Sequence, residues 1–189
     1  DVRLGSFARS EHAAWEGRTL GEVVEATGMD PVDVVCDLLM REDLRVNQVT
    51  PGPNKAGTLR FLQHPVAMVG TDGVLIGDKP APRSYGSFPR ILGEFVREER
   101  AISLESAVQR MTGMAADRLG LRERGRLVDG LAADVVVFDP ATVRSLATYD
   151  EPRSYPIGIH HVVVNGTLVV DGGTHTGATP GRGIRLGRD

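Results

Sequence analysis

The 189-residue chain has little cysteine, no long apolar run and no excess of charge of one sign. Its single cysteine, Cys36, cannot form an internal disulfide, which fits a reducing cytoplasm. A net charge of -3 with 25% charged residues indicates no basic surface for nucleic acid. No apolar stretch approaches the length of a membrane span, and no secretory signal pattern is present. We therefore expect a cytoplasmic protein that binds neither nucleic acid nor a membrane.

The chain also lacks the histidine arrangement of a catalytic metal site. It has no His-x-His pair and no set of histidines at strand ends; its histidines are His12, His64, His160, His161 and His175. A catalytic zinc site takes about three protein ligands and a water. The sequence therefore does not supply a visible zinc site by itself.

Apolar spacing and breaker residues divide the first part of the chain into alternating strands and helices. We expect one helix from Thr19 that ends at Gly28, and a second that begins at Asp30-Pro31, where a capping residue precedes proline. The second helix carries Cys36, which we expect to be buried. The other elements expected here are strands at 2–7, 45–50 and 66–69 and helices at 55–63, 91–100 and from 103 onward. This alternation favours βα units.

After Gly120 the pattern changes to short strands. The run at 134–140 is β-branched and ends at a proline, and the run at 161–170 is interrupted by Asn165-Gly166, a strong hairpin signal. The last residues, 172–189, are rich in glycine and are expected to be irregular. We therefore expect an α/β region at 1–122 and antiparallel strands with an irregular tail at 123–189.

The most informative stretch is the apolar run that leads to Asp72. Residues 66–69 have the pattern of a strand buried on both faces, and Asp72 follows between Gly70 and Gly73. A strand that delivers a carboxylate to its C-terminal end, before a long loop, is typical of a catalytic residue in a (β/α) barrel. We expect such a loop at 73–90. An Asp-Gly pair is also a common plain turn, so these residues alone leave both interpretations open.

Two motifs in the second region resemble the C-terminal part of metal-dependent amidohydrolases. One is 125–139 (GRLVDGLAADVVVFD), and the other is 162–170 (VVVNGTLVV). In that superfamily a distorted TIM barrel carries hydrolytic metal chemistry, and a small β-sandwich flanks it. The resemblance implies that 1–122 form C-terminal βα units of a TIM-like amidohydrolase barrel, with an active-site loop at 73–90. It also implies that 123–189 form strands of the β-sandwich and the tail.

Motifs in the first region resemble, more specifically, the N-acyl-D-amino-acid deacylase (D-aminoacylase) branch. They occur in the order 16–20 (EGRTL), His64-Pro65, 70–73 (GTDG) and 80–90 (PAPRSYGSFPR). Ala81 departs from the pattern, because relatives often carry histidine between the two prolines. The substrate class and the activity that the resemblance implies are therefore less directly supported at this position.

The resemblance implies a role for each of two residues. Asp72 corresponds to the catalytic carboxylate at the end of the last barrel strand and is also a candidate metal ligand. Such a carboxylate takes a proton from a zinc-bound water and returns it to the leaving amine. Arg83 resembles the arginine that binds the substrate's α-carboxylate, a task that suits a bidentate guanidinium. The implied cofactor is zinc, bound mainly by residues upstream of this chain. The implied substrate is a small N-acyl-D-amino acid, hydrolysed to a carboxylate and a free D-amino acid.

The chain is short for this architecture. A complete (β/α)8 barrel takes about 250 residues, and 1–122 hold about three strands. We therefore expect the chain, which starts without Met, to be the C-terminal segment of a longer enzyme and to be inactive alone. Late barrel strands in isolation would expose apolar faces and unpaired edges, so we expect it to need the missing N-terminal segment or self-association. Two alternatives remain: a dihydroorotase- or hydantoinase-like cyclic amide hydrolase, and a non-catalytic structural or assembly fragment.

Overall fold

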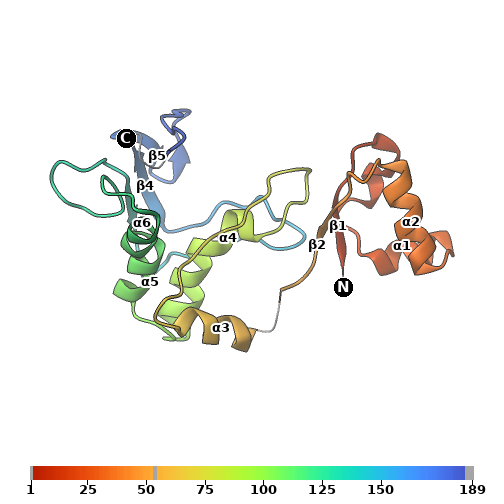
Figure 1. Ribbon diagram of the computed structural model, residues 1–189, viewed down its shortest axis with the longest axis horizontal. Helices are drawn as coiled ribbons and strands as arrows, with labels where there is room; N and C mark the ends of the chain where they lie inside the picture. Colours follow the sequence, from red (N-terminus) through yellow and green to blue (C-terminus); the bar gives the residue numbers. More distant parts are fainter. Residues whose placement is uncertain (1, 53–54, 186–189) are drawn as a thin grey trace. The chain divides into compact units, whose positions relative to one another are not determined.

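The computed structural model describes residues 2–52 and 55–185, which divide into two units (Figure 1). Unit 1 comprises 2–52 with Asp72–Tyr85 and Ala147–Tyr155, and unit 2 comprises Lys55–Thr71, Gly86–Leu146 and 156–185. The mixed α/β composition is as expected. The described strands form two small antiparallel sheets and close no barrel. The boundary expected near residue 122 stays a prediction.

Unit 1 is built on β1 (Arg3–Ser6), which pairs antiparallel with β2 (Asn47–Val49). Between them the chain forms a 3-10 helix, η1 (Ser10–Trp15), and two α-helices, α1 (Leu20–Thr27) and α2 (Pro31–Arg41). Two α-helices rather than one separate the strands, and β2 runs in the direction opposite to β1. The parallel pairing typical of βα units is therefore absent from this pair.

Local signals set the ends of α1 and α2 as the sequence predicts. The Thr19 side chain and Glu22 form a reciprocal capping box, and Gly28 ends α1 with φ +66°. Asp30 caps α2 by accepting from the backbone N–H of Val32. The two helices pack on β1 through a core of buried Leu4, Val23, Val34 and Leu38.

Cys36 lies outside this core. Its side chain is exposed, so the expectation of a buried thiol is wrong. The reason is helical spacing: Val34 and Leu38, four residues apart on α2, face the core, and Cys36 midway between them points to the other face.

The helical part of the chain that follows begins with α3 (Lys55–Gln63) and continues with α4 (Arg83–Arg90), within which the boundary between the units falls. Next come the π-helical η2 (Ile91–Glu98), α5 (Leu104–Met111) and α6 (Gly113–Leu119). Ser103 caps α5 by accepting from the N–H of Ser106 at 3.1 Å, as expected for this position. The core of unit 2 is formed by buried Leu92, Ala107 and Val143.

Unit 2 also contains a four-stranded antiparallel meander: β3 (Val135–Phe138), β4 (Ile159–Val164), β5 (Thr167–Asp171) and β6 (Thr174–His175). Asn165 and Gly166 join β4 to β5 with φ +47° and +78°, which confirms the predicted hairpin turn. The short strand β6 shows that the tail is not irregular throughout. No helix in the described part of the chain is long and apolar enough to cross a membrane.

Two expectations around Asp72 are wrong in the described structure. Residues 66–69 form no strand, because no neighbouring strand provides ladder hydrogen bonds. The Arg110 guanidinium instead donates to the backbone oxygens of His64 and Ala67, each at 2.7 Å. The segment 73–90 is a loop only in part: it is irregular up to Pro82 and helical in α4.

Candidate functional site

Asp72 and Arg83, the two residues expected at the site, lie together in unit 1. Arg83 Nη2 lies 3.2 Å from Asp72 Oδ2, and Arg83 Nε donates to the backbone oxygen of Asp72 at 3.0 Å. The Asp72 side chain is 89% exposed and the Arg83 side chain is 51% exposed. Because water screens such an exposed ion pair, the pair is weak and can exchange its contacts for those of a ligand.

The backbone on either side of Asp72 holds this pair together. Asp72 has φ +46°, in the left-handed region that aspartate enters more readily than most residues. The Ser84 hydroxyl donates to the backbone oxygen of Val74 at 3.3 Å, and a Cβ on Gly73 would lie 3.2 Å from Ser84 Oγ. The turn at Asp72 thus brings its carboxylate next to the start of α4. The roles assigned to Asp72 and Arg83 stay predictions.

A second polar cluster in unit 1 has no counterpart among the residues predicted from the sequence. The Glu42 side chain is fully buried, and its Oε2 accepts from the backbone N–H groups of Ala8 and Arg9 at 2.6 and 2.9 Å. Its Oε1 accepts from Nδ1 of buried His12, whose ring stacks on Trp15 with 5.2 Å between centroids. This cluster fixes both ends of η1.

The electrostatics of Glu42 follow from these contacts. Burial acts to raise the pKa of the Glu42 carboxyl. The hydrogen bonds from His12 and from the amides of Arg9 and Ala8 outweigh burial, and the net effect lowers the pKa below its usual value. Glu42 is therefore held ionised as an anchor for the chain at Ala8 and Arg9.

Glu16 is a further residue that local sequence patterns do not single out as part of the site. Its carboxylate Oε1 accepts from the backbone N–H groups of Asp78 and Lys79, the latter at 2.8 Å. Glu16 follows η1 directly, whereas Asp78 and Lys79 lie midway between Asp72 and Arg83. The only sequence signal for Glu16 is its place in the EGRTL motif.

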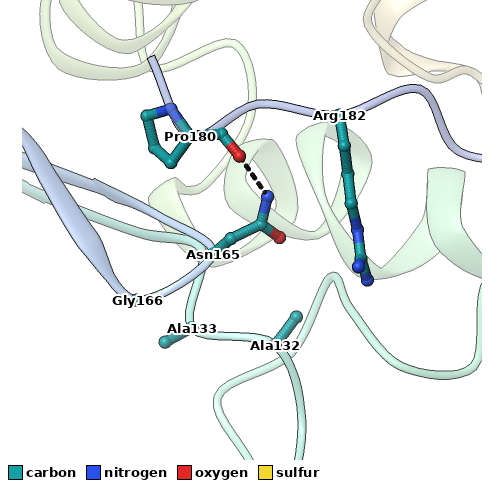
Figure 2. A pocket seen from close by; sticks show the side chains of 6 residues that line it. All are labelled: Ala132, Ala133, Asn165, Gly166, Pro180 and Arg182. Atoms are coloured by element: carbon teal, nitrogen blue, oxygen red, sulfur yellow. Dashed lines mark hydrogen bonds between the residues drawn. The ribbon is translucent and has the colours of Figure 1, made fainter. Parts of the chain in front are cut away.

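Unit 2 contains a separate open hollow at the β4–β5 turn (Figure 2). The Asn165 amide donates to the backbone oxygen of Pro180 at 2.9 Å across this hollow. Its lining residues are Ala132, Ala133, Asn165, Gly166, Pro180 and Arg182. They include no carboxylate, histidine, thiol or hydroxyl, so the hollow offers no group for acid–base or nucleophilic catalysis.

The described residues do not by themselves fit a metal ion. Within 2–52 and 55–185, no three side chains of His, Cys, Asp or Glu are grouped so that they could hold one. The partner of Asp72 is the cationic Arg83, which is not a metal ligand.

Comparison with known proteins connects this site to one family. Residues 2–170 match the model of the amidohydrolase family. The chain is 39% identical over 169 residues to N-acyl-D-aspartate deacylase of Alcaligenes xylosoxydans xylosoxydans. The matched region covers 86% of this chain and 34% of that protein. It is 40% identical over 166 residues to D-aminoacylase of the same organism, covering 88% of this chain and 33% of that protein. The chain thus spans about a third of the length of these relatives.

Solved structures lead to the same group. A crystal structure of D-aminoacylase superposes with a TM-score of 0.85 at 35% identity, covering 94% of this chain and 36% of that one. N-acyl-D-glutamate deacylase from Bordetella bronchiseptica, complexed with zinc and a phosphonate mimic of the tetrahedral intermediate, superposes with a TM-score of 0.82. That match has 39% identity and covers 89% of this chain and 34% of the other. The chain belongs to the amidohydrolase family, in the branch of D-aminoacylase and the N-acyl-D-amino-acid deacylases.

Proposed function

We propose that the chain is the C-terminal part of a zinc-dependent N-acyl-D-amino-acid deacylase and supplies its catalytic carboxylate, Asp72, and its substrate-binding arginine, Arg83. The observation that carries the proposal is the exposed contact of 3.2 Å between these two side chains. This contact supports the proposal that an acid–base group lies beside a carboxylate-binding group. An N-acyl-D-amino acid offers a partner to each, because its amide bond lies two bonds from its α-carboxylate.

In the proposed reaction, water adds to the amide carbonyl and the C–N bond breaks. Asp72 takes a proton from the attacking water and returns it to the amine nitrogen as that nitrogen leaves. This transfer gives a carboxylic acid and the amine of a D-amino acid, and the acid then passes its proton to the amine, so that the carboxylate and the ammonium form of the amino acid balance in atoms and charge. A carboxylate suits this shuttle because it accepts in its ionised form and donates in its protonated form.

Arg83 has a second role in this proposal. In the described structure its guanidinium contacts Asp72 through Nε and Nη2. A substrate carboxylate offers the same fork two oxygens in one plane, which is a better match than one side-chain oxygen and one backbone oxygen. Substrate binding would thus draw Arg83 away from Asp72 and leave the catalytic carboxylate able to accept a proton.

The cofactor and the remaining part of the site come from outside this chain in the proposal. Zinc would be bound mainly by residues upstream, because the described residues offer no cluster of metal ligands. The N-acyl-D-glutamate deacylase structure contains zinc, which supports the same cofactor here. The compartment proposed is the cytoplasm, where a chain with one exposed cysteine needs no disulfide.

Exposed apolar side chains on both sides of Asp72 support a missing partner segment. They are Val66, Met68, Val74, Leu75 and Ile76, with Val66, Leu75 and Ile76 between 62% and 69% exposed. In the proposal these residues pack against the part of a TIM-like barrel that the upstream sequence supplies, and β3–β6 contribute to a flanking β-sandwich. Where no upstream segment is present, self-association would cover the same side chains.

The test compares two proteins: the 189-residue chain and a longer version that includes the sequence upstream of Asp1. We expect the longer version to bind zinc and to hydrolyse N-acetyl-D-amino acids, and the isolated chain to do neither. Metal content and release of free D-amino acid are the measurements. Stoichiometric zinc and turnover in the isolated chain would refute the division of the site. A longer version that hydrolyses only cyclic amides, or nothing, would refute the deacylase proposal.

A further inference from the structure

The loop that joins Asp72 to Arg83 is attached at its apex to a residue from another part of unit 1. Glu16 Oε1 accepts from two successive backbone N–H groups, those of Asp78 and Lys79. Successive amides that converge on one anionic oxygen make a strong, charge-assisted contact. The two partners are 62 and 63 residues from Glu16 in sequence, so this contact joins segments that are distant along the chain.

Glycines on both sides of the contact show that the approach is close. Gly77 has φ +75°, and a Cβ there would lie 2.5 Å from Glu16 Oε1 and 2.9 Å from the backbone oxygen of Gly5. Gly17 has φ +84°, and a Cβ there would lie 3.0 Å from Lys79 Cγ. Neither position has room for a side chain, and both have backbone conformations that favour glycine. The glycines thus allow the loop apex and the turn after η1 to approach each other closely.

The same apex is held from a third segment of unit 1. Lys79 Nζ donates to the backbone oxygen of Asp150 at 2.6 Å, and the Arg153 guanidinium donates to the backbone oxygen of Gly77. Asp150 in turn pairs with Arg3 of β1 at 3.0 Å. Glu16 is the member of this arrangement whose carboxylate binds the loop backbone, so it holds the loop irrespective of the loop's side chains.

The chain between this anchor and Arg83 is stiff, whereas the chain between the anchor and Asp72 is not. Lys79 connects to Arg83 through Pro80-Ala81-Pro82, in which each proline fixes its own φ and restricts the residue before it. Pro80 is also fully buried. The other arm, 73–77, begins and ends with glycine. A displacement at Lys79 is therefore transmitted to Arg83 more than to Asp72.

We propose that Glu16 is a positioning residue: by binding the amides of Asp78 and Lys79, it sets the location of Arg83 for the substrate's α-carboxylate. This inference rests on the role proposed for Arg83. Loss of the Glu16 carboxylate loosens the loop apex, which then keeps only its contacts with Asp150 and Arg153, and the Pro80–Pro82 arm presents the guanidinium less precisely. Binding of the carboxylate weakens, while proton transfer by Asp72 is retained.

The experiment uses Glu16→Ala, Glu16→Gln and Glu16→Asp in the longer, zinc-loaded protein. Glu25→Ala, an exposed glutamate on α1 in the same unit, is the matched control. For Glu16→Ala we expect the KM for an N-acetyl-D-amino acid to rise about tenfold, with kcat nearly unchanged. The inhibition constant of the corresponding N-acetyl amine, which lacks the carboxylate, should not change. Glu16→Gln should match the wild type, because its amide oxygen accepts the same two hydrogen bonds.

A merely structural role for Glu16 predicts a different result. It would raise the KM and the amine inhibition constant together, or lower kcat as much as KM rises, and either outcome overturns the proposal. If Glu16→Ala does not fold, Glu16→Asp replaces it: its carboxylate is one methylene too short to reach the amides, so its KM should rise, and a wild-type KM would overturn the proposal.

Two further measurements separate this inference from the proposed function. Arg83→Ala tests the carboxylate-binding role alone: an unchanged KM would refute that role, whatever the Glu16 variants do. Hydrogen exchange of the peptide that contains Asp78 and Lys79 tests the anchor alone, even in an enzyme without deacylase activity. Exchange should be faster in Glu16→Ala and unchanged in Glu16→Gln and Glu25→Ala, and equal exchange in all three would overturn the anchor.

Discussion

Units 1 and 2 hold their backbones together by different means. Unit 2 relies on a four-stranded ladder and on arginines that donate to carbonyl oxygens. Arg110 binds the oxygens of His64 and Ala67, and Arg97 binds the oxygen of Val143 at 2.6 Å. An arginine stays charged over the whole practical pH range. These arginine contacts of unit 2 are therefore largely independent of pH.

Unit 1, which contains the candidate site, also has cationic side chains that donate to distant backbone oxygens, as Lys79 and Arg153 do. In addition, its short two-stranded sheet is accompanied by two glutamates that accept from backbone N–H groups distant in sequence. Glu42 accepts from Ala8 and Arg9, and Glu16 accepts from Asp78 and Lys79. Protonation removes the negative charge that strengthens these hydrogen bonds. The comparison teaches that the region that carries the proposed chemistry includes two long-range contacts that are strongest when a glutamate is ionised.

The largest expected effect separates the units by function. In the longer protein, Asp72→Asn in unit 1 should lower kcat about a thousandfold, because an amide cannot take the proton of the attacking water. Asp171→Asn on β5 of unit 2, also at an exposed aspartate, should leave kcat unchanged. Steady-state hydrolysis of an N-acetyl-D-amino acid measures both, and circular dichroism checks the fold. An Asp72→Asn enzyme with wild-type kcat would remove Asp72 from the mechanism.

The next effect concerns stability. Glu42→Ala should lower the free energy of unfolding of unit 1 by about 4 kcal/mol, because it leaves His12 and two amides without their buried acceptor. Glu94→Ala in unit 2 removes a carboxylate that is 25% exposed and should cost less. Hydrogen exchange resolved by peptide separates the two units. Equal losses in both variants would contradict the contrast between the units.

The acid dependence of Glu42 has a defined sign. Its pKa is lowered in the folded state, so its contribution to stability is present above the unfolded value of about 4.3 and is lost as pH falls through the folded value. Unit 1 of the wild type should therefore weaken on acidification. Glu42→Gln cannot titrate at this position, so its stability should depend less on pH, and the two proteins should converge at low pH. Parallel curves would exclude Glu42 as the titrating group.

The sequence predicts those features that depend on neighbouring residues. The capping residues of α1, α2 and α5 and the Asn165-Gly166 turn were all identifiable, because each is decided within a few positions. The strand at 66–69 is wrong because a strand needs hydrogen-bonding partners, and Arg110 provides the contacts instead. Helix α4 contains glycine and proline, which favour a loop locally, so the segment 73–90 was expected to be irregular.

The residues in and around the candidate site also differ in whether the sequence identifies them. Asp72 and Arg83 were identifiable from a resemblance and from their positions on one loop. Glu42 and Glu16 were not, because their partners lie 30 to 63 residues away and no local pattern specifies such pairs. His12 illustrates the difference: in the sequence it stands alone, and in the structure it is the buried partner of Glu42.

Substitution of one glycine in each unit by alanine tests how closely the backbone there approaches other atoms. Gly158→Ala in unit 2 should cost about 3 kcal/mol of unfolding free energy, because the new Cβ would lie 2.5 Å from the backbone nitrogen of Val143. Gly77→Ala in unit 1 should cost about 2 kcal/mol, because some of its clashing atoms belong to side chains that can move. Gly166→Ala, where φ is +78° but nothing lies within 4 Å, should cost about 1 kcal/mol.

These three variants also distinguish function from stability. Only Gly77→Ala should raise the KM for an N-acetyl-D-amino acid, since it alone displaces the loop that carries Arg83. Chemical denaturation gives the free energies, and kinetics of the longer protein gives the KM. A rise in KM in the Gly158→Ala protein as large as that for Gly77→Ala would mean that general loosening, rather than the loop, controls substrate binding.

The smallest expected effect compares two helix caps. Thr19→Ala at the start of α1 in unit 1 and Ser103→Ala at the start of α5 in unit 2 each remove a hydroxyl that accepts from a backbone N–H, at 3.2 and 3.1 Å. Each should cost about 1 kcal/mol at neutral pH. The Thr19 cap depends on pH as well, because Thr19 shares its box with Glu22, whose pKa is lowered mainly by the hydrogen bond from the Thr19 backbone. As pH falls, protonation of Glu22 weakens the box in the wild type, so the cost of Thr19→Ala should shrink. Denaturation at neutral and acid pH measures this change, and a cost of Thr19→Ala independent of pH would show that Glu22 adds nothing to the cap.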